Sequence, residues 1–267
     1  MDFTITTPAD GLIPSQPTSL STKRECGFMN TRSDLTIVIP AKNEAKLIPQ
    51  LLNSLANQDY PEMPNTKILV ADAGSTDGTP EIVMRFRDRL QVTVIPGGLP
   101  SVARNAGAAL AATQYVLFID ADVEPTSNSL IRRAVELAQN KHLHCVTTNI
   151  ICREGNWLDK AIYLGNDFFQ HLSRLHQPFS TGMFMLFDKR RFDELDGFHE
   201  QVHFAEDYLL SKQVARSKFG IVRGGVYTTN RRFQKMGHLR VIWLFLFTAV
   251  NFWNPSHFLR DHKYWQT

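Results

Sequence analysis

Two carboxylates follow an apolar run in the middle of the chain. Residues 115–119, Tyr-Val-Leu-Phe-Ile, lead into Asp120, and Asp122 comes two positions later. Side chains alternate between faces along an extended segment, so we expect both carboxylates to point the same way and a positive group to lie in front of them. Carboxylate oxygens suit Mg²⁺ or Mn²⁺, which usually keep coordination places for phosphate oxygens. The pair therefore predicts a site for a divalent cation.

The same Asp-x-Asp pattern has two other interpretations. One is a polar turn that follows a strand. The other is the first motif of phosphohydrolases of the haloacid-dehalogenase kind, in which Asp120 would be the nucleophile. That motif calls for Thr or Val two positions after the second Asp, where this chain has Glu124. It also normally opens its domain, whereas three strand-like runs precede Asp120 here.

A second polar loop, Asp72-Ala-Gly-Ser-Thr-Asp-Gly-Thr, follows another apolar run. Its glycine falls one place late for a calcium-binding EF-hand loop and the acid at the last position is missing, which excludes that kind of site. The chain also lacks the Gly-x-x-x-x-Gly-Lys-Ser/Thr and Gly-x-Gly-x-x-Gly patterns that hold phosphates. A plain turn before a helix is the alternative interpretation.

The elements expected to position these acids alternate between strand and helix. Short apolar runs predict strands at 35–40, 67–72, 92–95 and 115–120. Helical spacing of apolar residues predicts helices at 47–55, 80–86, 101–113 and 127–140. This alternation predicts an α/β fold with a mostly parallel sheet covered by helices on both faces. Ligands of such sheets bind beyond the carboxyl ends of the strands, which is where the motifs at 40–44, 72–75 and 120–122 lie.

The regular alternation of predicted strands and helices ends at about residue 140. The run at 145–151 predicts a strand, and a segment rich in aromatic residues follows it. Residues 181–200 predict a strand, a short helix and a turn, and residues 205–220 predict a helix that Gly220 ends. We interpret this part as a second half packed on the first.

Six motifs between about residues 34 and 235 are similar, in order and spacing, to those of one enzyme family. They are VIPAKNEA, LVADAGSTDGT, ARNAG, YVLFIDAD, TGMFML with DELDGFHE, and AEDYLL. The chain thereby resembles the inverting family-two glycosyltransferases. The resemblance implies a GT-A fold, with a nucleotide-sugar-binding half at 34–140 and an acceptor half at 141–235. It says nothing about which sugar is moved.

The resemblance assigns roles on the donor side residue by residue. Pro40, Ala41 and Glu44 correspond to contacts with the base and ribose, and Asp72 to the acid that contacts the base. Arg104 corresponds to the residue near the sugar or diphosphate. Asp120 would face the ribose or sugar, and Asp122 would bind the Mn²⁺ or Mg²⁺ ion. Many members have a second acid where this chain has Ala73, so base recognition can differ.

On the acceptor side, Glu206 and Asp207 resemble the catalytic Glu-Asp pair of the family, with Asp207 as the base. Thr181 and Gly182 lie where the family lines the acceptor site. The Gln-x-x-Arg-Trp motif of processive synthases is absent, and Arg231 and Arg232 stand near its place as candidate diphosphate contacts. The absence implies transfer of one sugar at a time.

The function that follows is inverting, metal-dependent transfer of a single hexosyl group from a nucleotide diphosphate sugar to an acceptor hydroxyl. The enzyme alternative is the phosphohydrolase built on Asp120. The alternative without catalysis is a sugar-nucleotide-binding module that has lost turnover, against which intact Asp122 and Asp207 argue.

Composition adds weaker constraints. The net charge of +3 suits an anionic ligand or a membrane surface but is too small to indicate nucleic acid, so we expect no nucleic-acid partner. Three widely separated cysteines, Cys26, Cys145 and Cys152, follow no metal-site spacing and are typical of buried residues in a reducing, cytoplasmic compartment. Residues 1–33 are rich in Ser, Thr and Pro, lack the pattern of a signal peptide, and predict a disordered tail.

The C-terminal segment, residues 236–267, is apolar and aromatic. Every residue from Val241 to Val250 except Thr248 is apolar, but a helix over 241–253 would be only about 20 Å long, short of the ~30 Å bilayer core. Basic residues and interfacial aromatic residues flank it. This pattern predicts a peripheral contact with the inner face of the cytoplasmic membrane, toward a lipid-linked acceptor. A buried core helix or a dimer contact is the alternative.

Overall fold

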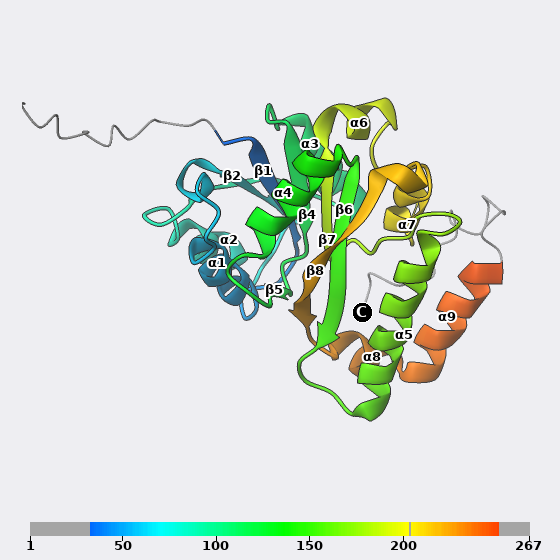
Figure 1. The fold of residues 1–267 in the computed structure, drawn as a ribbon. Coiled ribbons are helices and arrows are strands. Elements are labelled where there is room, and N and C mark those ends of the chain that lie inside the picture. The colour runs from blue at the N-terminus through cyan, green and yellow to red at the C-terminus, as the bar shows by residue number, and fades with distance from the viewer. Residues whose placement is uncertain (1–32, 203, 251–267) are drawn as a thin grey trace, which may run out of the picture. The chain divides into compact units, whose positions relative to one another are not determined.

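An eight-stranded mixed sheet lies at the centre of the computed structural model, which describes residues 33–202 and 204–250 (Figure 1). The strands are β1 (Leu35–Ala41), β2 (Lys67–Asp72), β3 (Gln91–Pro96), β4 (Tyr115–Ile119), β5 (Glu124–Pro125), β6 (Cys145–Cys152), β7 (Phe184–Asp188) and β8 (Phe219–Thr228). Their order in the sheet is β3-β2-β1-β4-β7-β6-β8-β5. Neighbours among β1 to β4 run parallel, β7 is antiparallel to both β4 and β6, and β6 pairs with β8 in parallel.

Helices cover both faces of this sheet. They are α1 (Ile48–Ala56), α2 (Thr79–Met84), α3 (Pro100–Ala109), α4 (Leu130–Lys141), α5 (Trp157–Ser173), α6 (Lys189–Glu194), α7 (Glu206–Ser211), α8 (Arg231–Met236) and α9 (His238–Val250). Alternating residues of β1 show the two layers: Ile37 and Ile39 pack in the core that contains α1, α2 and α4, whereas Val38 packs with α3 and α6. Gly107 lets α3 come this close, because a Cβ there would collide with Val38.

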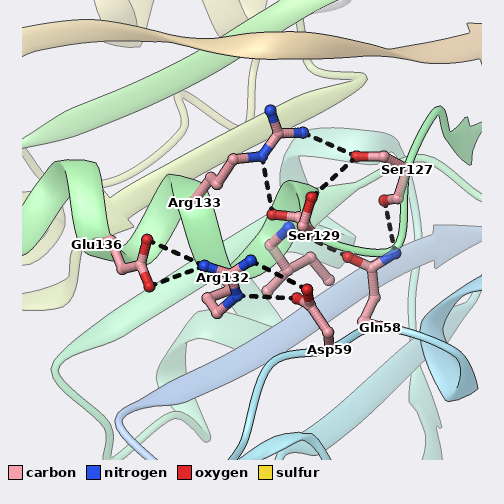
Figure 2. Close-up of polar contacts among 8 residues, drawn as sticks. Gln58, Asp59, Ser127, Ser129, Arg132, Arg133 and Glu136 are labelled. Carbon is pink, nitrogen blue, oxygen red and sulfur yellow. Dashed lines mark hydrogen bonds and ion pairs between the residues drawn. The ribbon is translucent and has the colours of Figure 1, made fainter.

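Hydrogen bonds hold the C-terminal end of the loop that carries Asp120 and Asp122, just before α4. The Asp59 amide donates to Asn128 O (2.7 Å), and Gln58 Nε2 donates to Ser127 O (3.1 Å). Gln58 Oε1 also accepts from the Ile131 amide, so this distant residue caps the first turn of α4 (Figure 2). Arg132 adds a two-pronged ion pair with Asp59. These contacts hold the connection from β4 to α4 against the end of α1.

The second half of the chain departs from the sequence prediction in two places. The predicted helix at 205–220 is wrong beyond Ser211: α7 ends there, and Gly220 lies inside β8 rather than at a helix end. Pairing with β6 decides this, since long-range hydrogen bonding overrides local propensity. The aromatic segment was assigned no element, yet it forms α5, whose start carries a capping box of Asn156 and Asp159.

The chain ends are described only in part. The tail predicted for residues 1–33 lies outside the described residues, except Ser33, which is buried and whose hydroxyl bonds to that of Thr66. Cys145 and Cys152 are free and buried, as predicted, while Cys26 lies outside the described residues. In α9, Val241 is buried, whereas Leu239 and Trp243 are exposed. None of the helices in the described ranges has the length and apolar content that a membrane crossing requires.

Candidate active site

The loops that follow β1 and β2 are joined into one wall. The Asn43 amide donates to Ser75 Oγ (2.8 Å), and Asn43 Oδ1 accepts from the Thr76 amide (2.9 Å). The Glu44 amide donates to Thr79 Oγ1 (2.9 Å). Because both loops follow the carboxyl ends of parallel strands, this wall lies at the edge of the sheet where ligands bind in such folds.

Asp72 organises its own loop within this wall. Its Oδ2 accepts from the amides of Gly74 (3.1 Å) and Ser75 (3.0 Å), and its Oδ1 accepts from Ser75 Oγ (2.5 Å). Ala41 lies opposite Asp72 in the sheet register, with Pro40 before it. The structure therefore brings Pro40, Ala41 and Asp72 together, three of the residues expected to contact the nucleoside. Oδ1 of Asp72, which accepts only from Ser75 Oγ, has a further lone pair for a base.

Arg104 from α3 is the centre of a buried ion cluster. It is 1% exposed; its Nη1 donates to Glu206 Oε1 and its Nη2 to Asp120 Oδ1, both at 2.7 Å. Burial lowers the pKa of Arg104, but the charges of Asp120, Glu206 and Asp207 and the hydrogen bond to Asp120 together raise it above its ordinary value. Removing Arg104 would leave Asp120 and the buried Glu206 without their shared counter-charge. The cluster thus fixes α3, the end of β4 and the start of α7 relative to one another.

Position 182 lies so close to the Arg104 guanidinium that glycine, which has no side chain, fits there without displacing it. A Cβ there would fall well inside contact distance of Arg104 Nη2. The Gly182 amide donates to Asp207 Oδ2 (2.5 Å), so the same residue also holds the expected base. Thr181, also expected on the acceptor side, is half-buried next to it.

We expect Gly182→Ala to lower the free energy of unfolding by about 1–3 kcal/mol, the usual effect of overpacking, because Arg104 must move away. Displacement of Arg104 and Asp207 should also lower the transfer rate. Thermal unfolding and steady-state kinetics measure both effects. Gly165→Ala is the matched control: it lies in α5 with nothing within 4 Å of the added Cβ, so it should leave stability equal or slightly raised. Equal unfolding midpoints and rates for Gly182→Ala and the wild type would contradict the crowding argument.

Asp207 is a half-buried carboxylate held from two sides. Besides the Gly182 amide, the Tyr208 amide donates to its Oδ1 (2.8 Å). Burial, followed by the charge of Glu206, raises the pKa of Asp207 to about 7, while Arg104 and the two amides act in the opposite direction. The preceding Ala205 has φ +58°, an uncommon backbone conformation for a residue with a side chain, which lets α7 begin here. A carboxylate with such a pKa is suited to accept a proton near neutral pH.

Arg231 joins the other two acids. Its guanidinium bonds both oxygens of Glu44 (3.0 and 2.6 Å), and its Nη2 also donates to Asp122 Oδ2 (3.1 Å). Burial raises the pKa of Glu44, and burial followed by the charge of Asp120 raises the pKa of Asp122. Arg231 and Arg232 lower the pKa of Asp122. The start of α8 thus lies against the loops that follow β1 and β4.

Positive groups do face both acids of the Asp-x-Asp motif, but a different one faces each. Asp120 pairs with Arg104, and Asp122 pairs with Arg231. The expectation of an extended segment was wrong at this point, since β4 ends at Ile119 and a turn follows. The change of direction lets the two carboxylates reach different arginines.

Comparison with known proteins gives the family. The profile of the family described as Glycosyl transferase family 2 matches residues 36–196, more than half of the chain. The chain belongs to glycosyl transferase family 2. Poly(ribitol-phosphate) beta-N-acetylglucosaminyltransferase TarS of Staphylococcus aureus is 37% identical over 91 residues, which are 33% of this chain and 16% of TarS. Glycosyltransferase AglE of Haloferax volcanii is 34% identical over 102 residues, which are 37% of this chain and 33% of AglE. This family-2 glycosyltransferase therefore matches a third or less of the length of these relatives.

Solved structures share the fold of this family-2 glycosyltransferase. The mannosyltransferase PcManGT from Pyrobaculum calidifontis, in complex with GDP-Man and Mn²⁺, has a TM-score of 0.60 at 23% identity, over 78% of this chain and 62% of that chain. TarS 1–349 has a TM-score of 0.57 at 21% identity, over 79% of this chain and 65% of that chain. At these identities the likeness shows the fold, and it confirms the GT-A type of α/β fold predicted from the motifs.

Asn105 and Phe198 are residues beside the site of this family-2 glycosyltransferase that were not predicted from the sequence. Asn105 Nδ2 donates to Phe198 O (2.7 Å) and its Oδ1 accepts from the Phe198 amide (2.9 Å), while the Phe198 ring lies 5.3 Å from the Arg104 guanidinium. The Asn105 side chain thus holds the Phe198 backbone, and the Phe198 ring lies against the Arg104 guanidinium. The signal was present, because both lie inside motifs shared with the family, ARNAG and DELDGFHE.

Proposed function

We propose that this enzyme transfers one hexosyl group at a time from a nucleotide diphosphate sugar to an acceptor hydroxyl, with inversion at the anomeric carbon and with the help of Mg²⁺ or Mn²⁺. The observation that carries the proposal is Asp207, a two-point anchored carboxylate with a pKa near neutrality. It is linked through Glu206 and Arg104 to Asp120, at the end of β4. We assign residues 34–140 to the donor half and 141–235 to the acceptor half.

The donor would lie along the wall formed by the loops after β1 and β2. Pro40, Ala41 and Asp72 would contact its nucleoside, and Asp120 its ribose or sugar. Solved proteins of similar fold are complexes with UDP-GlcNAc, for TarS 1–349, and with GDP-Man, for PcManGT. Both ligands are nucleotide diphosphate sugars, which supports the same donor class here.

Asp122 is the residue that would hold the cation. Among the described residues there is no group of three or more His, Cys, Asp and Glu that could hold a metal ion. Mg²⁺ and Mn²⁺ are nevertheless often coordinated by one protein carboxylate, with diphosphate oxygens and water as the remaining ligands. When bound, the cation would neutralise charge that develops on the departing diphosphate. Because Arg231 contacts Asp122 in the structure, it would exchange this contact for the diphosphate, with Arg232 beside it.

Asp207 would perform the proton transfer. The acceptor oxygen forms a bond to the anomeric carbon while the bond from that carbon to the diphosphate oxygen breaks, and its electron pair leaves with the nucleoside diphosphate. The hydroxyl proton passes to Asp207, whose oxygens each retain a lone pair beyond those used by the Gly182 and Tyr208 amides. Attack opposite the leaving group inverts the anomeric carbon. Glu206 is buried against Arg104 and acts as a positioning residue.

Nucleotide binding tests this proposal. We expect a nucleoside diphosphate to raise the unfolding temperature in the presence of Mn²⁺ and not in excess chelator, because a ligand that binds only the folded state stabilises it. The matching nucleotide sugar, with a panel of hydroxyl acceptors, should yield a product with one added sugar of inverted configuration by NMR. Retention of configuration, or release of phosphate from simple esters without sugar transfer, would refute the proposal.

A further inference from the structure

The helix α5 turns its apolar residues outward. Trp157, Leu164, Phe168 and Leu172 lie on one side at helical spacing, and Leu175 follows just beyond the last turn. Their exposed fractions range from 47% for Leu172 to 79% for Trp157. Surface helices normally place such residues against the core, so this arrangement is the reverse of the usual one.

The inner side of α5 carries buried polar side chains beside the buried Tyr163. Gln170 is fully buried and its Nε2 donates to Thr148 O (3.0 Å), and Asp167 accepts from the Ile150 amide (3.0 Å). Asp159, 1% exposed, accepts from the Asn156 amide (2.9 Å). Hydrogen bonds to β6, rather than apolar packing alone, attach this helix to the sheet. Their positions fix which side of α5 faces out.

The helix α9 extends the exposed apolar surface. It begins against the first turn of α5, where His238 Nε2 and Asp159 Oδ1 are 2.5 Å apart. The helix α5 itself packs against β6. Leu239 and Trp243 of α9 are 85% and 57% exposed. Eight of the ten large hydrophobic residues exposed among the described residues belong to this surface. We call it the α5–α9 face: Trp157, Leu164, Phe168, Phe169, Leu172, Leu175, Leu239 and Trp243. A cluster of this kind marks an interaction site.

The charges around the α5–α9 face are basic. Lys160 is exposed on α5 and Arg174 is exposed just after its end, where Arg216 is anchored by donating to Leu175 O (2.7 Å). Both acids of α5 are occupied on the inner side: Asp159 with His238 and Asp167 with the Ile150 amide. An apolar strip bordered by cations complements an anionic lipid surface, in which long basic side chains reach the headgroups.

We propose that the α5–α9 face binds the surface of an anionic lipid bilayer. The helix α5 is about 25 Å long and would lie in the plane of the interface, with its apolar side among the upper acyl chains. A second copy of the chain is a poorer occupant. A twofold contact through α5 would bring Lys160 and Arg174 of one copy near these cations of the other, and α5 presents no outward acid to compensate them.

The start of α8 connects this face to the donor site. Asn230 Nδ2 donates to Asp159 Oδ2 (3.2 Å), and the next residue, Arg231, bonds Glu44 and Asp122. The Phe233 ring also packs on the Tyr163 ring of α5, with centroids 5.4 Å apart. Binding to a bilayer would therefore hold the site in a defined orientation to the surface. If the proposed transfer is correct, this orientation suits a lipid-linked acceptor.

Flotation of the full-length chain with vesicles tests the proposal directly. We expect the protein to float with vesicles of equimolar phosphatidylglycerol and phosphatidylcholine at low salt, and much less with phosphatidylcholine alone or at high salt. The double variant Leu164→Ser with Phe168→Ser should lower the partition coefficient by more than about tenfold. Leu110→Ser is the matched control, since Leu110 is 52% exposed after α3, and it should float as the wild type does.

A second pair of variants separates charge from apolar contact. Lys160→Glu with Arg174→Glu should lower partitioning by at least about tenfold, whereas Arg87→Glu, exposed on the opposite edge beyond α2, should not. Failure of the wild type to float, or equal flotation of the Leu164 and Leu110 variants, overturns the proposal. So does a dimer that the Leu164 variant dissociates while vesicles have no effect, because the face would then be a self-contact. A nucleoside diphosphate should raise the unfolding temperature of every variant equally. Loss of flotation with an unchanged nucleotide response would indicate a lost lipid contact, whereas the absence of any nucleotide response would count against the proposed function.

Discussion

Asp207→Asn is expected to lower the transfer rate by at least about a hundredfold while leaving nucleotide affinity unchanged. The amide that replaces the carboxylate cannot take the acceptor proton. It also places an NH₂ group against one of the two amides, of Gly182 and Tyr208, that now donate to Asp207. The unmet donor should reduce stability by about 1–3 kcal/mol. Single-turnover rates and nucleotide titration separate the chemical step from binding.

The pH dependence of the same rate follows from the raised pKa of Asp207. The groups that face this carboxyl are Glu206, Arg104 and the two backbone amides. Because the pKa is about 7, the base is protonated below that value, and the rate should fall as pH decreases through neutrality. Since the folded pKa lies above the unfolded one, the native state binds the extra proton, and this group makes the protein less stable as pH rises toward 7. Asp207→Asn should remove both effects.

Asp88→Asn is the matched control for this variant, because Asp88 is exposed in the turn before β3 and should leave rate, pH profile and stability unchanged. An unchanged rate for Asp207→Asn would reject Asp207 as the base. A flat pH profile of the wild-type rate around neutrality would contradict a base with a raised pKa.

Asp122→Asn is expected to lower activity by about 10³-fold or more and to make nucleotide binding independent of Mn²⁺. The reason is the loss of the carboxylate that would share the cation with the diphosphate; several kcal/mol of transition-state stabilisation correspond to this factor. Calorimetric titration of a nucleoside diphosphate with Mn²⁺, and again in excess chelator, measures the effect. The wild type in chelator should behave like the variant.

Glu124→Gln serves as the control for local charge. Glu124 lies two residues beyond Asp122 and pairs with Arg153 at 2.7 Å, a partly exposed contact, so its loss should change nucleotide affinity little. Full activity of the wild type in excess chelator would contradict the metal assignment. Loss of nucleotide binding in Asp122→Asn even without Mn²⁺ would point to a role in holding Arg231 instead.

The sequence by itself determined most of the elements in residues 34–140, the proposed donor half. Its strands are short apolar runs closed by Pro, Gly or acidic residues, and its helices carry their apolar residues on one side, so local patterns and burial agree there. The predicted strand at 35–40 corresponds to β1, and the predicted strand at 67–72 is β2 itself. The acids at the ends of β1, β2 and β4 were found because parallel strands bring their carboxyl ends to one edge.

Only the tertiary structure decided how those acids are partnered. Arg231 meets Glu44 across 187 positions and Asp122 across 109. Arg104 meets Glu206 across 102. No local rule relates residues so far apart, and the turn after Ile119, which sends Asp120 and Asp122 to different arginines, breaks the alternation on which the sequence argument relied. The predicted helix at 205–220 is too long for a similar reason: its last residues belong to β8, which forms by pairing with β6.

The direction in which α5 faces was also beyond the sequence. Helical spacing of Leu164, Phe168 and Leu172 shows that they share one side, but spacing carries no information about which side meets the sheet. The hydrogen bonds that Asp167 and Gln170 make to β6 settle it, and they turn the apolar side outward. Burial of a polar side chain is tolerated when a backbone partner lies within reach, and the position of that partner is set only once the whole sheet has formed.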